Sequence, residues 1–341
     1  MGFWTYNGGD IDGDEIDWTA LTEISIPTAA ALTTSWTKAL DFSGSSERAQ
    51  MVNTSSVYNP MMMADKSVTV AAPDSSDSRP WAATCVFKID GYSANQHVWN
   101  LGEGAGSSDD NIYLRVTQFG ALYFGWGRDG ALNEHLIATN LGNASWYGCY
   151  IGHSGVRLSG ADATPANLAS HFQIKLMFFQ NGEWDFNPNP QGAGAGVWTT
   201  TGGRMDRQIE GQFTIGGRGS NRNFHGKIAS MLVTTLKREA APFPSNEEIK
   251  VMVTDPIRWI QDYKAGETFR QSYYSTNTNW DSASNSQKTA GTQIWLMGDG
   301  TSDAYAKIRN QVSPTDQNYT PLNMINMVSG DIQTVSIPGL S

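Results

Sequence analysis

The sequence predicts an all-β protein built as a two-sheet antiparallel sandwich, and three features of its 341 residues lead to that prediction. Charged residues make up only 16% of the chain, whereas helical proteins draw heavily on Glu and Lys. Glycine, at 35 residues, and aromatic residues, at 11%, suit tight turns and half-buried strands. Short segments of alternating apolar and polar residues recur between turn signals from about residue 38 to 236.

These alternating segments predict strands and hairpins in order along the chain. Ile112, Leu114 and Val116 alternate with polar neighbours, which predicts a strand with one buried face. Asn181-Gly182, a strong hairpin signal, separates two further segments. Strands are predicted over residues 82–90, 112–117, 122–126, 172–179, 184–186, 213–215 and 227–235. Strands of this number and spacing favour two packed antiparallel sheets.

Short helices are predicted between and after these strands. Residues 164–171 begin with Thr-Pro, a cap followed by a proline at the first helical position. Residues 245–253 begin with a capping box, and residues 257–263 favour a further helical turn. The segment 265–290 is polar and rich in Asn and Ser, which suits an exposed extended chain.

The chain is therefore divided into an acidic N-terminal arm (1–35), a sandwich domain (36–255) and a C-terminal extension for attachment or assembly (256–341). Residues 10–14 of the arm resemble the opening of an EF-hand calcium loop, but the required glycine and final glutamate are missing. An acidic turn is the better interpretation of this segment.

Charge and cysteine content exclude several classes of protein. A net charge of −10 argues against nucleic acid as the main partner, because phosphate binding needs clustered Lys and Arg. No apolar run approaches the ~18 residues that a membrane span needs, and no secretory signal follows Met1. Cys85 and Cys149 could form one disulfide, but two free buried thiols are favoured.

Three groups of segments resemble the concanavalin A-like lectin/glucanase superfamily in its laminin-G-like branch. They are Ala39 to Gly44, the hairpin from Asp110 to Phe124, and Ile215 to Gly217 followed by Asn223 to Ile228. The resemblance covers about residues 38–253 and implies a jelly-roll sandwich. Each motif alone is weak, but the three occur in the expected order.

A narrower set of segments is similar to virion structural proteins of marine tailed bacteriophages, often cyanophages. They are residues 146–151, 157–169, 255–259 and 294–300. This similarity implies a non-enzymatic structural protein of the virion, as capsid decoration or as a fibre or appendage component. It implies assembly in the host cytoplasm, partners among other virion proteins and copies of itself, and contact with a host-surface polysaccharide. A free carbohydrate-binding module or lectin is the alternative.

The motifs of the related glucanases are incomplete in this chain. Those enzymes place Glu-x-Asp-x-x-Glu on one strand, so that the carboxylates line one cleft. Here Glu183 and Asp185 are followed by Pro188, which can act neither as acid nor as base. The two carboxylates are interpreted as polar positions of a hairpin. Nucleophile-elbow, zinc-protease and phosphate-loop motifs are also missing from the sequence, which predicts no catalytic residue and no enzyme.

Binding residues can still be suggested, each beside a simpler structural interpretation. Glycan stacking needs exposed aromatic faces with polar groups beside them, although burial is the commoner fate of such rings. The candidates for glycan binding are Trp126, Arg128, Asp129, Asn143, Trp146 and Tyr147. The resemblance also admits calcium as a cofactor, held by Asp109, Asp110 and Asn111, although ordinary polar residues before a strand are favoured there.

Five tryptophans lie outside the predicted sandwich domain: Trp4, Trp18, Trp259, Trp280 and Trp295. Each exposed ring would forgo roughly 1.5–3 kcal/mol of burial. They are therefore predicted to bury against a neighbouring subunit or the particle surface. The alternative is that both ends of the chain fold back onto the sandwich of the same molecule.

Overall fold

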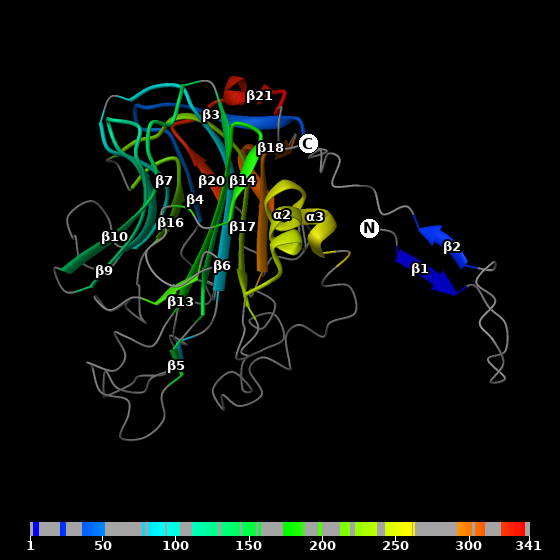
Figure 1. Cartoon of the computed structure of the whole chain (residues 1–341). Coiled ribbons are helices and arrows are strands. Elements are labelled where there is room, and N and C mark those ends of the chain that lie inside the picture. Colours follow the sequence, from blue (N-terminus) through cyan, green and yellow to red (C-terminus); the bar gives the residue numbers. More distant parts are fainter. Residues whose placement is uncertain are drawn as a thin grey trace, which may run out of the picture.

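The computed structural model describes a β-sandwich with two short helices on one side (Figure 1). The described residues are 3–6, 21–24, 36–51, 77–78, 81–92, 94–102, 111–128, 131–143, 145–154, 156–157, 173–186, 188, 197–199, 212–218, 222–236, 243–260, 262, 292–301, 304–310 and 322–337. Two short strand pairs stand apart in the pairing: β1 (Phe3–Tyr6) with β2 (Leu21–Ile24), and β5 (Asp77–Ser78) with β12 (Val156–Arg157).

The first sheet is centred on two long strands that pair with each other, β6 and β17. Its antiparallel strands, in spatial order, are β14 (Glu183–Asp185) and β15 (Val197–Thr199) side by side, β13 (Gln173–Gln180), β11 (Trp146–His153), β6 (Trp81–Ile89) and β17 (His225–Thr235). Beyond β17 lie β3 (Lys38–Ser43) along its first half, with β21 (Ile332–Thr334) outside it, and β18 (Thr292–Thr301) along its second half.

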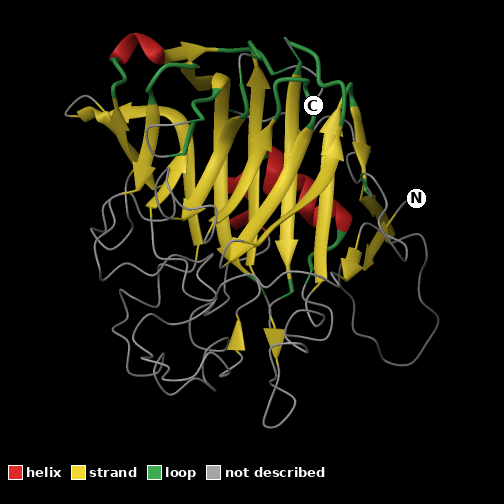
Figure 2. Cartoon of the chain, turned by 90° about the vertical axis from the view of Figure 1, so that its left-hand side faces the viewer, coloured by secondary structure: helices red, strands yellow, loops and turns green. Residues whose placement is uncertain are grey.

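The second sheet lies against the first and faces the viewer in Figure 2. Its antiparallel strands, in spatial order, are β10 (Ala131–Ala138), β9 (Leu122–Arg128), β8 (Asn111–Val116), β7 (Gln96–Gly102), β16 (Gln212–Ile215), β4 (Arg48–Met51), β20 (Leu322–Ile325) and β19 (Ala304–Asn310). The prediction of an all-β, two-sheet antiparallel sandwich is confirmed.

The C-terminal part of the chain completes both sheets instead of leaving them. β18 adds to the first sheet, its hairpin partner β19 adds to the second, and β20 and β21 pair with β4 and β3. The predicted boundary at residue 255 is therefore not a boundary of the fold. The sequence division failed there because β3 and β4 depend on strands more than 250 residues away, which local patterns do not reveal.

Apolar side chains fill the space between the sheets, and a second apolar layer lies outside the first sheet. On β6, Trp81, Ala83 and Cys85 face the second sheet, whereas Ala82 and Val86 face the opposite way. Both sets are buried, which explains why β6 reads as a continuous apolar segment.

Two helices cover the outer face of the first sheet: α2 (Asn246–Thr254) and α3 (Pro256–Trp259). The Ser245 side chain accepts a hydrogen bond from the Glu248 amide at 3.1 Å, which is one half of the predicted capping box. Pro256 starts α3, so the predicted second helical turn is also confirmed. A 3₁₀ turn, η4 (Ser329–Asp331), precedes β21.

The remaining local predictions have mixed outcomes. The predicted strands over 82–90, 112–117, 122–126, 172–179, 184–186, 213–215 and 227–235 correspond to β6, β8, β9, β13, β14, β16 and β17. Cys85 and Cys149 are free and buried, opposite each other on β6 and β11. The predicted helix at 164–171, the segment 265–290 and the acidic turn at 10–14 lie outside the described residues.

Candidate functional site

The outer face of the second sheet carries a row of polar residues that crosses five strands. The pairing registers place Thr214, Asn100, Tyr113, Gly125 and Glu134 side by side on β16, β7, β8, β9 and β10. Their strand neighbours Phe213, Leu101, Ile112, Leu114 and Phe124 belong to the core between the sheets. Because side chains alternate along a strand, the row points away from that core.

Tyr113 lies across the row and connects two of its strands. Its hydroxyl donates a hydrogen bond to Glu134 Oε1 at 2.7 Å. The ring reaches Glu134 by passing over Gly125, where an added Cβ would come within 2.3 Å of Tyr113 Cζ. Gly125 is therefore required for this close approach of ring and backbone, which explains a glycine in the middle of a strand.

A second row on the same face contains His97, Arg115 and Tyr123, which are opposite one another on β7, β8 and β9. Arg115 Nη2 contacts Glu134 Oε2 at 2.6 Å, and the Arg115 guanidinium lies 5.3 Å from the centre of the Tyr123 ring. The His97 ring stacks on Tyr113 with 4.7 Å between ring centres. The two rows therefore form one contiguous polar cluster.

The inner part of this cluster is buried with hydrogen-bonding atoms unmatched. His97 and Asn100 are each 1% exposed. Among the described residues, no hydrogen bond of standard geometry reaches His97 Nδ1, His97 Nε2, Asn100 Oδ1 or Arg115 Nε, although the Asn100 side chain lies near enough to His97 to act against the lowering of its pKa. A buried polar atom without a partner costs about 1–3 kcal/mol, so a group of them on one face calls for an explanation.

The outer part of the cluster is accessible. Glu134 and Arg222 are exposed, and Arg115 and Tyr123 are half-buried. The Arg222 carbonyl accepts a hydrogen bond from the His97 amide at 3.0 Å, which fixes the segment before β17 beside β7. The cluster thus has a buried floor around His97 and Asn100 and an exposed rim.

Burial and charge both act on the titratable groups of the cluster. Burial lowers the pKa of His97 well below its usual range, and the positive charges of Arg222, Arg218 and Arg115 lower it further. His97 is therefore neutral at pH 7, with one nitrogen as donor and the other as acceptor. Burial, followed by the contact with Glu134, raises the pKa of Tyr113, which remains a hydrogen-bond donor.

The aromatic residues predicted to stack on a glycan do not lie on this face. Trp126, Trp146 and Tyr147 are 3%, 7% and 2% exposed. Trp126 and Tyr147 belong to the core between the sheets, and Trp146 belongs to the layer under the helices. These three rings present no face to a sugar, so the structure contradicts their predicted role.

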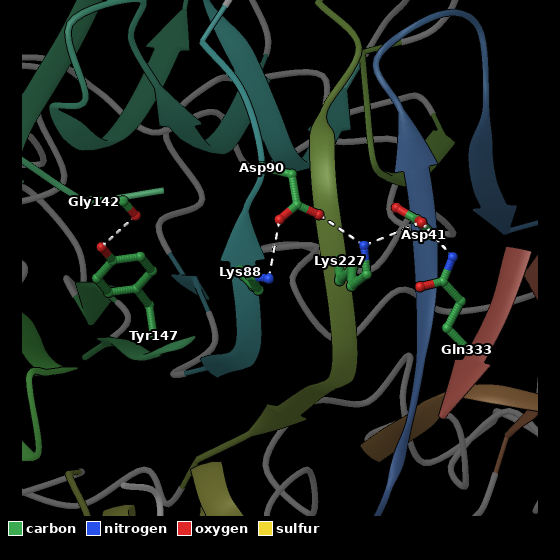
Figure 3. A network of polar contacts seen from close by, with 7 residues as sticks. All are labelled: Asp41, Lys88, Asp90, Gly142, Tyr147, Lys227 and Gln333. Atoms are coloured by element: carbon green, nitrogen blue, oxygen red, sulfur yellow. Dashed lines mark hydrogen bonds and ion pairs between the residues drawn. The ribbon is translucent and has the colours of Figure 1, made fainter. Parts of the chain in front are cut away.

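The other glycan candidates are only partly described. Asn143 is exposed in the turn before β11, so its predicted role stays a prediction. Nearby, the Tyr147 hydroxyl donates to the Gly142 carbonyl at 2.9 Å (Figure 3). The side chain of Arg128 and the whole of Asp129 lie outside the described part of the chain.

The predicted calcium ligands remain untested. Asn111 is buried at the start of β8, whereas Asp109 and Asp110 lie outside the described residues. The described part of the chain contains no group of three His, Cys, Asp or Glu side chains that could hold a metal ion.

The tryptophans assigned to assembly contacts are buried within the same chain where the structure describes them. Trp259 is fully buried under α2, and its Nε1 donates to Glu248 Oε1 at 3.0 Å. Trp295 is 1% exposed and stacks on Phe213 of the second sheet. Their predicted burial against a neighbour is wrong, because the C-terminal segment folds back onto its own sandwich. The side chain of Trp4 and the whole of Trp18 and Trp280 lie outside the described set.

A separate charged network lies on the first sheet (Figure 3). Lys227 Nζ contacts Asp90 Oδ2 at 2.8 Å and Asp41 Oδ2 at 3.1 Å, and Lys88 contacts Asp90 at 3.2 Å. Gln333 Nε2 donates to Asp41 at 2.6 Å. The two ammonium groups balance the two carboxylates, so this network ties together β3, β6, β17 and β21 and is not a candidate ligand site.

The near match to the glucanase motif forms the predicted hairpin. Glu183 and Asp185 lie exposed on β14, which pairs with β13 after the turn at Asn181 and Gly182. Both turn residues have positive φ, 54° and 83°, as a primed hairpin turn requires. The interpretation of these carboxylates as hairpin positions is confirmed.

The residues of the polar cluster were missed from the sequence, although one signal for them was present. The alternation of residues 112–117 already placed Tyr113 and Arg115 on the polar face of a strand. His97 and Asn100 gave no such signal, because an irregularity between His97 and Trp99 breaks the alternation of β7. The role of Gly125 depends on a ring from the neighbouring strand.

Comparison with protein-family models finds no match, and comparison with curated protein sequences finds none either. Many solved structures are distantly similar to this chain, and three of them illustrate the range. The CBM40 domain of the Ruminococcus gnavus IT-sialidase, bound to α2,3-sialyllactose, is 16% identical over 57% of this chain and 88% of its own, with a TM-score of 0.33.

The other two likenesses are equally distant. A heptameric SAP-like pentraxin from Limulus polyphemus is 12% identical over 65% of this chain and 84% of its own, with a TM-score of 0.37. Domains LG4-5 of the mouse laminin α1 chain are 10% identical over 64% of this chain and 48% of their own, with a TM-score of 0.33. The strand pairing places the chain among all-β sandwiches, and these likenesses say nothing about its ligand.

Proposed function

We propose that the chain is a non-catalytic glycan-binding sandwich whose ligand lies on the outer face of the second sheet. The observation that supports this most is the polar cluster, where His97 and Asn100 are buried with unmatched hydrogen-bonding atoms beneath an accessible rim. Because both residues are 1% exposed, a hydroxyl-rich ligand would contact the accessible rim above them, whose side chains supply both donors and acceptors.

The chemistry of the rim suits a sugar. Arg115 offers guanidinium donors, Glu134 offers carboxylate acceptors, and Tyr123 offers a half-buried aromatic ring beside them. Binding sites for small polar ligands commonly combine a few placed polar groups with aromatic surface. The three side chains come from neighbouring strands of one sheet, so they are held by a rigid scaffold.

The same geometry supports a non-catalytic role. Glycoside hydrolysis generally uses two carboxylates that flank the scissile bond. Among the described side chains of the cluster Glu134 is the single carboxylate, and both of its oxygens are engaged, one by Tyr113 and one by Arg115. Such a carboxylate orients its partners and accepts hydrogen bonds.

The wider setting that we propose is a bacteriophage particle, with the sandwich as capsid decoration or as part of a fibre or appendage. The support is the sequence similarity of four segments, three of which correspond to most of β11, to α3 and to part of β18. Mass spectrometry of purified particles should detect the chain at a fixed copy number. Its absence from particles that contain the other structural proteins would favour a free lectin.

Glycan binding can be tested with a matched pair of aromatic variants. Tyr123 lies beneath Arg115 on the second sheet, and Phe186 lies beneath Lys250 on the helix side at a similar distance, 5.3 Å against 5.2 Å. We expect Tyr123→Ala to weaken binding in affinity electrophoresis across a panel of neutral and acidic polysaccharides by about tenfold, a 1.4 kcal/mol effect. Phe186→Ala should change binding less than twofold. Equal losses in both variants, or no binding to any polysaccharide, would refute the proposed site.

A further inference from the structure

The chain has two cysteines, Cys85 and Cys149, and the fold brings them together within the first sheet. They are directly opposite each other on β6 and β11, which are antiparallel neighbours. Both belong to the core cluster between the sheets, so their side chains point to the same face. Both thiols are free, and each residue is 1% exposed. The fold therefore places two reduced thiols side by side although they are far apart in the sequence.

The spacing of opposite residues in an antiparallel pair suits a disulfide bond. Their Cα atoms are about 4.5–5.5 Å apart, which lies inside the range of about 4.4–6.8 Å that disulfides span. Their Cβ atoms are about 4.5–5.5 Å apart, so a small inward movement brings them to the ~3.5–4.5 Å that the bond needs. The paired strands β6 and β11 can therefore accommodate the bond with little change.

The surroundings of the pair decide with what and when these thiols react. The sequence contains no third cysteine, and on its other side Cys85 is opposite Met231 of β17, whose thioether does not exchange. Burial raises the pKa of Cys85, and the neighbouring Cys149 thiol raises it further. A buried thiol with a raised pKa is a weak nucleophile. Reaction at this pair therefore belongs to the folding chain, before the second sheet covers the strands.

We infer that Cys85 and Cys149 form an intramolecular disulfide when the chain folds in an oxidising environment. The oxidant is a small-molecule disulfide such as oxidised glutathione. One protein thiolate attacks it and releases one glutathione, and the second protein thiolate then attacks the mixed disulfide and releases the other. The protons of the two protein thiols end on the two glutathione thiols, so the protein is oxidised and the glutathione is reduced.

The bond would close a loop that contains β7, β8, β9 and β10. These four strands carry most of the polar cluster on the second sheet. The disulfide would therefore tie that part of the second sheet to the centre of the first and would fix the register of β6 and β11. The inference does not depend on the proposed glycan-binding function.

The test uses the full chain without substitutions. Reduced protein is unfolded in urea and refolded by dilution into buffer that contains either reduced or oxidised glutathione. The remaining thiols are trapped with iodoacetamide under denaturing conditions, and the intact mass is measured. Near-UV circular dichroism checks whether both products regain the same tertiary packing.

We expect the chain refolded with oxidised glutathione to be monomeric, lighter by two hydrogen atoms and closed to iodoacetamide. The chain refolded with reduced glutathione should take up two alkyl groups. The equilibrium constant for unfolding in urea should be at least about tenfold lower for the oxidised form, because the bond restricts the unfolded chain. Folded reduced protein that is placed in oxidised glutathione should lose its thiols at least about tenfold more slowly than the refolding chain.

A double variant, Cys85→Ala with Cys149→Ala, is the control, because its unfolding should be the same in both glutathione buffers. The comparison of the two wild-type products stands even where this variant fails to fold. Two reactive thiols in natively refolded protein after oxidised glutathione would overturn the inference. Glutathione adducts or disulfide-linked dimers in place of the internal bond would also overturn it. So would an internal bond in a product without the native circular dichroism, since bond and sandwich would then exclude each other.

Discussion

The two sheets of this sandwich have outer faces of opposite character. On the first sheet, Ala82, Val86 and Leu232 face outwards and are buried beneath α2 and α3. On the second sheet, the outward positions His97, Asn100 and Tyr113 are polar and also buried, but the described residues place no helix over them, and Glu134 beside them is exposed. A sandwich needs only its inner faces for a core, so each outer face is free to serve a different purpose. The helices cover the first, and we propose that the second binds the ligand.

The difference between the two outer faces predicts that the largest losses in the free energy of unfolding come from side chains buried at α2 and α3. Trp259→Ala removes a fully buried ring and its hydrogen bond to Glu248. It should lower the free energy of unfolding by about 3–5 kcal/mol. Tyr123→Ala, on the open face, should cost about 1 kcal/mol or less, because that ring is half-buried. Urea unfolding followed by fluorescence measures both. Similar losses would mean that both outer faces act as core.

The next largest loss of stability is expected at Gly125, on the outer face of the second sheet. Gly125→Ala would place a Cβ against the Tyr113 ring and force that ring away from Glu134. We expect a loss of about 1–3 kcal/mol in unfolding free energy. Combining it with Tyr113→Ala should cost less than the sum of the two single changes, because the clash disappears with the ring. Strict additivity would show that ring and glycine do not constrain each other.

A smaller effect belongs to the charged network on the first sheet. Burial alone would raise the pKa of Asp90, but the hydrogen bond and charge of Lys227, with those of Lys88, lower it below its usual range. The pKa of Lys227 is raised, because its contacts with Asp90 and Asp41 outweigh burial. Lys227→Met should cost up to about 1 kcal/mol at pH 7, in line with partly exposed ion pairs.

The sign of the pH dependence follows from these two shifts. The contribution linked to Asp90 is present above about pH 4 and is lost as the pH falls through the lowered pKa. The contribution linked to Lys227 is present below about pH 10.4 and is lost as the pH rises through the raised pKa. Stability measured from pH 2 to 8 should therefore show wild type and Lys227→Met converging at the acidic end. A constant gap across that range would assign the loss to packing.

The smallest change in stability is expected at Phe119, which serves as a control position. Phe119, in the turn between β8 and β9, is 80% exposed. Phe119→Ser should change the free energy of unfolding by less than about 0.5 kcal/mol and leave glycan binding unchanged. A loss of binding would move the ligand from the face to the hairpin tips.

The sequence predicted the fold better than the site, and the reason lies in distance along the chain. Strand β8, the turn at Asn181 and Gly182, and the cap at Ser245 are local signals, and each was predicted correctly. The polar cluster depends on the lateral register of five strands, which brings Thr214 beside Asn100 although more than a hundred residues separate them. No local pattern carries that register.

The tryptophans also show that the sequence alone did not predict which aromatic side chains are buried. Trp126 and Trp146 have polar residues or glycine nearby in the sequence, and Trp295 lies outside the predicted sandwich domain, which suggested exposed or intermolecular roles. In the fold, each lies on a strand whose neighbours cover it. Residue type alone did not distinguish a binding ring from a core ring, because that difference depends on which face of the strand is covered.

The pairing of the C-terminal strands β20 and β21 with the early strands β4 and β3 has a consequence for biosynthesis. β4 acquires β20, and β3 acquires β21, only after about 270–290 intervening residues have been translated, which takes roughly 15–60 s at 5–20 residues per second. Until then the nascent chain presents unpaired strand edges, which are prone to aggregation. We expect the sandwich to close only after β20 and β21 have left the ribosome, with slow folding that reflects its long-range pairing. Recombinant yield should therefore respond more to slower synthesis and chaperone supply than to further stabilisation of the native state.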